Sequence, residues 1–130
     1  MSSLKTLHFL FFLCLSSSFY AQINIDSLNN LLPTSTGTDR VDLLNTIAWE
    51  LKFSDPNRAI KLCKESQGLA KGSEYLSGLS KTLYQLTVIL QIKGEFDESF
   101  KVSEEAIKVY KQLNNSAGVA KIWTVQAIGF

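Results

Sequence analysis

The sequence predicts an all-α fold of stacked antiparallel helical hairpins, comprising about two and a half copies of one repeated unit. Three observations support this class. Residue types recur at a fixed offset of 40 along the chain, apolar residues follow the i, i+3, i+4, i+7 spacing of amphipathic helices, and short polar breaks separate the apolar runs. No stretch alternates apolar and polar residues for long enough to predict a strand.

The repeat is visible in two blocks of residues that keep the same spacing. Ala59, Cys63, Ser66 and Leu69 recur at this offset as Ser99, Ser103, Ala106 and Val109. Gly78, Leu79, Ser80, Lys81 and Leu83 recur at the same offset as Gly118, Val119, Ala120, Lys121 and Trp123. An earlier block that begins at Leu44 aligns with the block at Leu83 at an offset of 39. One residue is therefore missing from the turn near Ser54-Asp55-Pro56.

Residues 1–21 have the layout of a cleavable secretory signal peptide, because Lys5 precedes an apolar run that is followed by small and polar residues. We expect cleavage after Ala21, or after Ser18, because Phe19 is large for its place three residues before the first site. The apolar run of roughly 9 residues is much shorter than the roughly 20 that a membrane span needs. The sequence thus predicts a secreted or periplasmic protein without a membrane span.

Cleavage would remove the groups on which several functions depend. Loss of Lys5 leaves 12 basic residues against 12 acidic ones, a balance that gives no electrostatic drive toward nucleic acid or anionic lipid. Loss of His8 and Cys14 leaves no histidine and a single thiol, Cys63. An internal disulfide, a Cys/His zinc site and histidine base catalysis are then excluded. We therefore expect no enzymatic activity, no metal and no cofactor.

The elements expected after the leader follow the apolar runs in order. Residues 22–38 should hold a short helix near 24–32 and a linker broken at 33–38. The repeat domain at 39–130 divides into a first repeat at 39–73, a second at 75–113, and the first helix of an incomplete third at 116–130. Its helices are expected near 39–53, 56–71, 75–93, 96–113 and 116–130.

Local signals mark where these helices begin and end. Asp55 can accept hydrogen bonds from the free N–H groups of the following helix, and Pro56 suits its first turn. Gly94-Glu95-Phe96 separates the two helices of the second hairpin. Lys71-Gly72-Ser73 and Asn114-Asn115-Ser116 are the expected connectors between hairpins.

The second repeat carries Leu83-x-x-Leu86-Thr87-x-x-Leu90, then Gly94-Glu95-Phe96-Asp97-Glu98-Ser99-Phe100, then Ala106. This pattern resembles the tetratricopeptide repeat family, in which a large residue, a small one and an aromatic mark the first helix and Gly-x-aromatic opens the second. The first repeat fits more loosely. HEAT and armadillo repeats have similar periods but do not call for this turn. The small residues expected between paired helices are Ala48, Ala59, Ser66, Thr87, Ser99 and Ala106.

The resemblance implies a protein–protein interaction module, whose concave groove binds a peptide or partner protein. Exposed positions of each first helix line the groove in that family. Here they are Asn45, Trp49, Lys52, Tyr84, Val88 and Gln91, and Thr124 and Ile128 would continue the row. Trp49 and Tyr84 are the best anchors, because aromatic side chains supply large contact area at low entropic cost. The alternative for both is a place in the core.

Two further expectations concern the chain as a whole. Similar bacterial chains place such repeats in a sensor, so the alternative function is the extracytoplasmic segment of a membrane signalling protein such as a histidine kinase or nucleotide cyclase. The last helix should expose an apolar surface suited to a homodimer, and this surface would comprise Ile122, Trp123, Val125 and Phe130. Cys63 aligns with Ser103, and we expect it to be a buried packing residue.

Overall fold

The computed structural model describes residues 25–129. The expected signal peptide at 1–21 and Phe130 lie outside the described residues. The chain divides after Pro33 into two compact units. The described part of the first unit consists of helical residues 25–31, which lead into a 3-10 helix at Leu32–Thr34.

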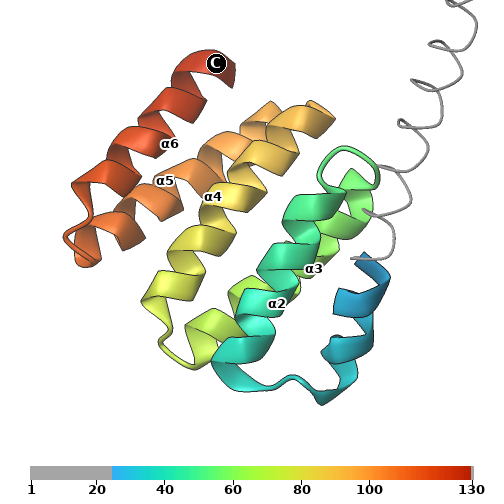
Figure 1. The fold of residues 1–130 in the computed structure, drawn as a ribbon. Coiled ribbons are helices and arrows are strands. Elements are labelled where there is room, and N and C mark those ends of the chain that lie inside the picture. Colours follow the sequence, from blue (N-terminus) through green and yellow to red (C-terminus); the bar gives the residue numbers. More distant parts are fainter. Residues whose placement is uncertain (1–24, 130) are drawn as a thin grey trace, which may run out of the picture. The chain divides into compact units, whose positions relative to one another are not determined.

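The second unit confirms the predicted fold class. Its α-helices are α2 (Gly37–Leu51), α3 (Pro56–Gly72), α4 (Leu76–Lys93), α5 (Phe96–Gln112) and α6 (Ser116–Gly129). Helices α2 and α3 form one antiparallel hairpin, α4 and α5 form the next, and α6 packs against this second hairpin (Figure 1). No strand occurs within residues 25–129.

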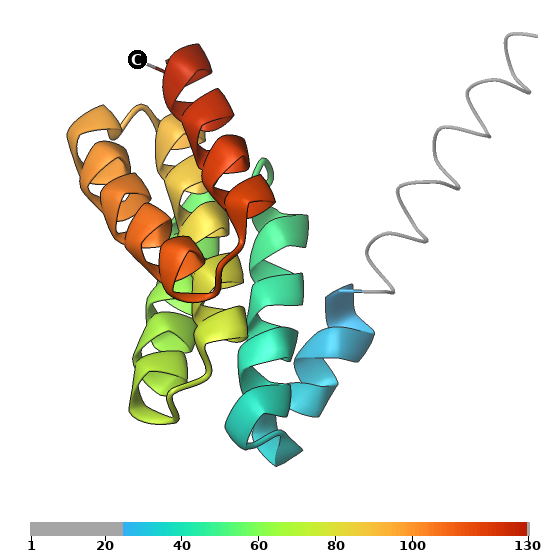
Figure 2. The same ribbon diagram turned by 90° about the vertical axis from the view of Figure 1, so that its left-hand side faces the viewer.

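The five helices lie in two layers. Helices α2, α4 and α6 form one layer, and α3 and α5 form the other (Figure 2). Backbone contacts join α2 to α4 and α4 to α6, whereas none joins α3 to α5. The helices of the first layer are therefore more closely spaced, so the stack curves toward them.

The observed helix bounds reproduce the sequence period. Helix α5 follows α3 at an offset of 40 at both ends, and the first residues of α4 and α6 are separated by the same offset. The first residues of α2 and α4, Gly37 and Leu76, are separated by an offset of 39. From the start of its first helix to the start of its second, the first hairpin is therefore one residue shorter than the second hairpin. The connector itself is not shorter, since residues 52–55 separate α2 from α3 and only residues 94–95 separate α4 from α5, so the predicted place of the missing residue in this turn is not confirmed.

The predicted start of α3 is also confirmed. The side chain of Asp55 accepts a hydrogen bond from the backbone N–H of Arg58 at 3.0 Å, and Pro56 occupies the first turn. At the end of α4, Gly94 adopts φ 83°, a left-handed conformation that glycine reaches without a steric penalty. This glycine lets the chain reverse within Gly94-Glu95 before α5 begins.

The two connectors between hairpins share one unusual backbone conformation. Glu74 has φ 54°, and Asn114, which is its equivalent in the next repeat, has φ 52°. In both connectors the following residue donates its N–H to the carbonyl five positions back, at 2.9 Å. Asparagine tolerates the left-handed region better than glutamate. The first connector therefore carries backbone strain that the second largely avoids.

This difference predicts the outcome of a reciprocal exchange. Glu74→Asn should raise the free energy of unfolding by about 0.5–1 kcal/mol, because it relieves left-handed strain at an exposed site. Asn114→Glu should lower it by a similar amount. Urea denaturation followed by circular dichroism measures both changes. Equal stabilities for the two variants would show that the side chain at these connectors is energetically neutral.

Small residues bring the paired helices together as expected. Ala48, Ala59, Ser66, Thr87, Ser99 and Ala106 are all fully buried. Cys63 is also fully buried, and its burial raises the pKa of the thiol to about 12. The thiol therefore stays protonated at physiological pH, which agrees with a packing role and not with that of a nucleophile.

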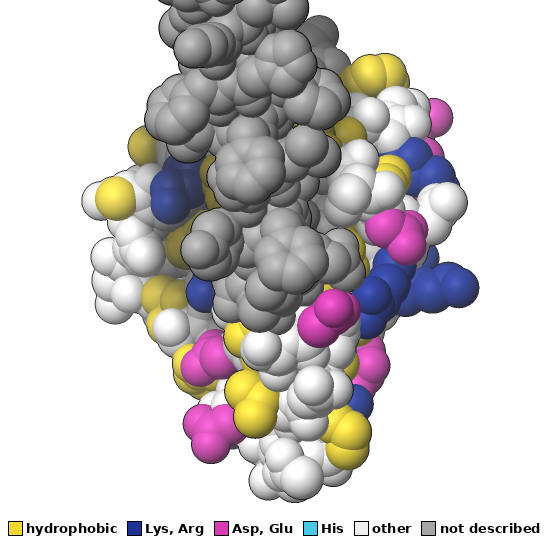
Figure 3. All heavy atoms as spheres, turned by 45° about the vertical axis from the view of Figure 1, so that its right-hand side comes forward, with side chains coloured by type: hydrophobic (Ala, Val, Ile, Leu, Met, Phe, Trp, Pro, Cys, Tyr) yellow, Lys and Arg dark blue, Asp and Glu magenta, His cyan; other side chains and the backbone are white. Residues whose placement is uncertain are grey.

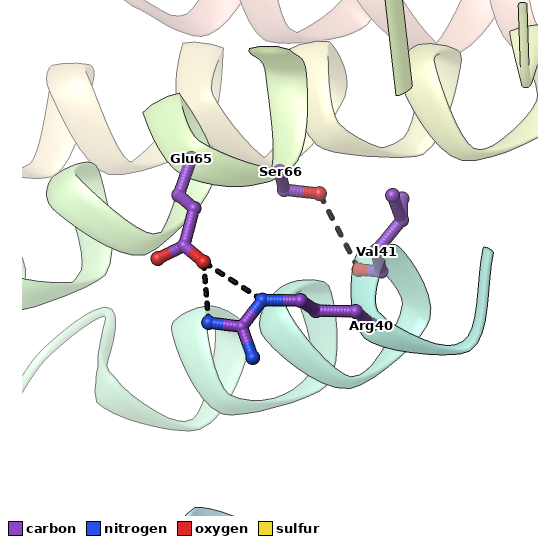
Figure 4. A network of polar contacts seen from close by, with 4 residues as sticks. All are labelled: Arg40, Val41, Glu65 and Ser66. Carbon is purple, nitrogen blue, oxygen red and sulfur yellow. Dashed lines mark hydrogen bonds and ion pairs between the residues drawn. The ribbon is translucent and has the colours of Figure 1, made fainter. Parts of the chain in front are cut away.

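Polar contacts add to the packing between α2 and α3 (Figure 4). The guanidinium of Arg40 reaches one carboxylate oxygen of Glu65 through two nitrogens, at 2.6 and 2.9 Å. The hydroxyl of Ser66 lies 3.3 Å from the carbonyl oxygen of Val41. Because Arg40 and Glu65 are both partly exposed, their ion pair contributes about 0–1 kcal/mol. Packing of the apolar and small residues dominates this interface.

Candidate functional site

The residues predicted to bind a partner lie on α2, α4 and α6, except Lys52, which directly follows α2. Because the stack curves toward the layer that these three helices form, the outer surface of this layer is the concave face of the second unit. We call this surface the first-helix face. Whether a predicted residue can contact a partner depends on which side of its helix it occupies.

Asn45 cannot contact a partner, and its assignment to the groove is wrong. The side chain is fully buried. Its amide oxygen lies 2.8 Å from the hydroxyl of Thr82 and 3.0 Å from that of Ser66, and its amide nitrogen donates to the carbonyl of Gly78 at 3.4 Å. Asn45 therefore joins α2, α3 and α4 through a buried polar cluster.

Trp49 and Tyr84 come together across α2 and α4. Their ring centroids lie 6.1 Å apart and their planes are inclined by 34°, a geometry within the favourable range for aromatic pairs. Each side chain is half-buried. Neither residue is wholly part of the core, so the two rings present one aromatic surface on the first-helix face.

Two lysines flank this aromatic pair. The ammonium of Lys52 lies 4.3 Å from the ring centroid of Trp49, and that of Lys121, on α6, lies 5.0 Å from the ring centroid of Tyr84. Both distances allow a cation–π interaction. Lys52 also donates to the carbonyl of Trp49 at 3.1 Å, which satisfies one carbonyl at the end of α2. Within residues 25–129, neither lysine forms an ion pair with a carboxylate.

Lys121 and the exposed Phe53 were not among the predicted site residues. Phe53 is 73% exposed, and its ring centroid lies 5.0 Å from the ammonium of Lys52. The repeat does pair Lys121 with Lys81 in the sequence. Its approach to Tyr84, however, depends on how closely α6 packs against α4, which the period does not reveal.

Val88 and Gln91 continue the face along α4 with different roles. Val88 is half-buried. The side-chain amide of Gln91 donates to the carbonyl of Val125 at 3.1 Å and thus joins α4 to α6. Gln91 therefore stabilises the packing of the face, and Val88 adds apolar surface beside the aromatic pair.

On α6 the predicted row and the predicted dimer surface have mixed outcomes. Thr124 is exposed and its hydroxyl donates within its own helix, while Ile128 is 82% exposed. Trp123 is 57% exposed, as expected for a contact surface. Ile122 is fully buried, so its assignment to the dimer surface is wrong. Its burial agrees with the packing of α6 against α4 and α5, which covers one side of the helix.

Groups that would support chemistry are few in the part of the chain that the structure describes. No group of three or more His, Cys, Asp or Glu residues could hold a metal ion there. No described helix is both long and apolar enough to cross a membrane. On the surface in Figure 3, basic and acidic side chains are interspersed with uncharged ones. The first-helix face carries aromatic, apolar and lysine side chains.

No protein-family model, no curated protein and no solved structure matches this chain.

Proposed function

We propose that this chain is a protein–protein interaction module that binds a peptide or partner protein on the first-helix face. The observation that carries the proposal is the half-buried pair of Trp49 and Tyr84, with the ammonium groups of Lys52 and Lys121 over the two rings. Aromatic residues that keep exposed surface on a rigid scaffold are the commonest energetic centres of protein interfaces.

The flanking lysines narrow the kind of segment that would fit. A partner that places an apolar side chain against the rings and a carboxylate beside the lysines would match both features of the face. Because the aromatic pair lies on α2 and α4, which pack against each other and against α3, little ordering of the chain is needed on binding. The face therefore favours an extended or helical segment with mixed apolar and acidic character.

The arrangement of the helices also supports a tetratricopeptide-type module as part of this proposal. Two hairpins follow one another at a fixed period, small residues fill their interfaces, and the first helices form the inner layer. Proteins built this way present extended concave surfaces that bind polypeptides. The proposal combines this general property with the specific aromatic and lysine groups described above.

The test compares the chain with a variant that lacks both rings. Trp49→Ala combined with Tyr84→Ala should weaken binding of a partner isolated from the source cell envelope by about 10- to 100-fold, because each ring would act as an energetic centre. Isothermal titration calorimetry with the purified partner measures this change. Circular dichroism should show that both proteins remain helical.

Phe100→Ala is a matched control for the loss of an aromatic residue. Phe100 is 47% exposed on α5, in the other layer, so its removal should leave binding unchanged. Equal binding by the double variant and the native chain would show that the partner contacts another surface. A loss of helical signal in the double variant would show instead that the two rings act mainly in folding.

A further inference from the structure

A second surface lies on α6, on the side that corresponds to the covered side of α4. In α4, Leu83 and Thr87 lie one turn apart on the same side of the helix and are fully buried, and the hydroxyl of Ser99 on α5 donates to the carbonyl of Thr87 at 2.8 Å. The equivalent residues one repeat later, on α6, are Trp123, which is 57% exposed, and the exposed Ala127. Helix α6 therefore presents to solvent the positions that α4 buries against its second helix.

Two cavities, one at each connector between hairpins, also differ in whether a following helix bounds them. One of about 460 Å³ lies at the first connector between hairpins, and its lining residues are Ala70, Lys71, Glu74, Leu76, Leu79 and Gln112. One of about 370 Å³ lies at the second connector, and its lining residues are Lys111, Asn114, Asn115, Ser116, Val119 and Trp123. Gln112 belongs to α5, so the first cavity is bounded by the second helix of the following hairpin. Only α5, α6 and their connector line the second cavity.

Charge supplies a further constraint. The ammonium of Lys71 pairs with a carboxylate oxygen of Glu105 at 2.6 Å, which links α3 to α5. Lys111 occupies the equivalent position one repeat later, lines the second cavity and is exposed. It forms no ion pair with any carboxylate of residues 25–129. Consider a helix that packs against α6 in the way that α5 packs against α4. If this helix carries an acidic residue at the position equivalent to Glu105, its carboxylate would lie beside Lys111.

We propose that this face of α6 and its adjoining cavity bind a partner helix that resembles α5. The partner helix packs antiparallel to α6. It places small residues against Trp123 and Ala127, a hydroxyl near the carbonyl of Ala127, and one carboxylate near Lys111. This site is separate from the first-helix face. Between α6 and the partner helix, it would repeat the kind of hairpin interface that α4 and α5 form.

A synthetic peptide with the sequence of residues 96–112 serves as the probe, because α5 is a helix that already fits the equivalent surface. We expect it to bind the full chain with a change in Trp123 fluorescence, recorded in a Trp49→Phe background so that one tryptophan reports. Trp123→Ala, whose binding is measured by isothermal titration calorimetry because no reporting tryptophan remains, should weaken binding by about 10-fold, since it removes the largest contact. Because an isolated helix of this length is marginal, the same peptide is also tethered to the end of the chain by a glycine–serine linker, which raises its effective concentration to about the millimolar range.

Charge exchange tests the orientation of the partner helix. Lys111→Glu in the chain, or the Glu105→Lys exchange in the peptide, should each weaken binding by about 3- to 10-fold, and combining them should restore it. The matched control is Lys108→Glu in the chain, at another exposed lysine of α5. This substitution should change binding of the peptide little. The proposal would be overturned if the tethered peptide did not alter Trp123 fluorescence. It would also be overturned if neither Trp123→Ala nor the charge exchange changed the affinity of the peptide. A homodimer that buries Trp123 in the absence of peptide would also overturn it.

Discussion

Asn45→Ala is expected to lower the free energy of unfolding by about 2–4 kcal/mol. The wild-type amide oxygen lies within hydrogen-bond distance of the hydroxyls of Ser66 and Thr82, and all three residues are fully buried. Alanine removes that acceptor and leaves a cavity between three helices. The hydroxyls retain the carbonyls of Val41 and Gly78 as acceptors, which limits the loss.

Chemical denaturation of the native chain and of the variant measures this loss. Asn57→Ala is the matched control, because Asn57 is exposed on α3 and should tolerate the change within about 0.5 kcal/mol. Partner binding can be measured with the same two variants. Because Asn45 is buried, Asn45→Ala should affect the affinity for the partner only by destabilising the fold. A stable Asn45→Ala protein that failed to bind its partner would contradict the structural role assigned to this residue.

Gly118→Ala is expected to destabilise the protein by about 1–3 kcal/mol, although alanine normally favours a helix. A Cβ atom at this position would overlap Cδ1 and Cε1 of the Tyr110 ring. Tyr110 is itself only 7% exposed, so its ring has little room to move. The backbone N–H of Gly118 would keep its bond to the side chain of Asn115, so the added methyl group is the sole cause of the loss.

Gly68→Ala is the matched control within the same fold. Gly68 lies inside α3, is exposed, and has nothing within 4 Å of a Cβ atom. Alanine there should raise the free energy of unfolding by about 0.5–1 kcal/mol. The midpoint temperature of thermal denaturation should rise for Gly68→Ala and fall for Gly118→Ala. Adding Tyr110→Ala should remove most of the cost of Gly118→Ala, because Ala70 occupies the equivalent position in the first repeat. A Gly118→Ala cost that persisted in the Tyr110→Ala background would contradict this account.

The fold was largely predictable from local signals. Asp55 and Pro56 marked the start of α3, and Gly94 marked the end of α4, because free backbone groups and left-handed conformations each favour particular residue types. The fixed offset then carried these boundaries to the other hairpin. The strained backbone at Glu74 gave no such signal, since glutamate is a poor marker of a left-handed conformation.

The candidate site was predictable only in part. Trp49, Tyr84 and Val88 keep the partial exposure that a binding face requires, whereas Asn45 is fully buried. Successive residues of a helix point about 100° apart, so a small error in the assumed face moves a side chain from the groove into the core. Asn45 lies at the boundary between these two faces, and a polar side chain in the sequence does not reveal partners on two other helices.

By itself, the sequence determined the number of repeated helices and the small residues between them, because these follow from turn chemistry and spacing along the chain. It also gave the limits of α3 to α6 to within one residue, whereas α2 lies two residues earlier than the predicted 39–53. Tertiary structure alone decided three things. It enclosed Asn45 between α2, α3 and α4, brought Lys121 over the ring of Tyr84, and left Trp123 exposed where Leu83 is buried. The physical reason is that burial and pairing belong to neighbouring helices, and equivalent positions in a repeat acquire different environments when their neighbours differ.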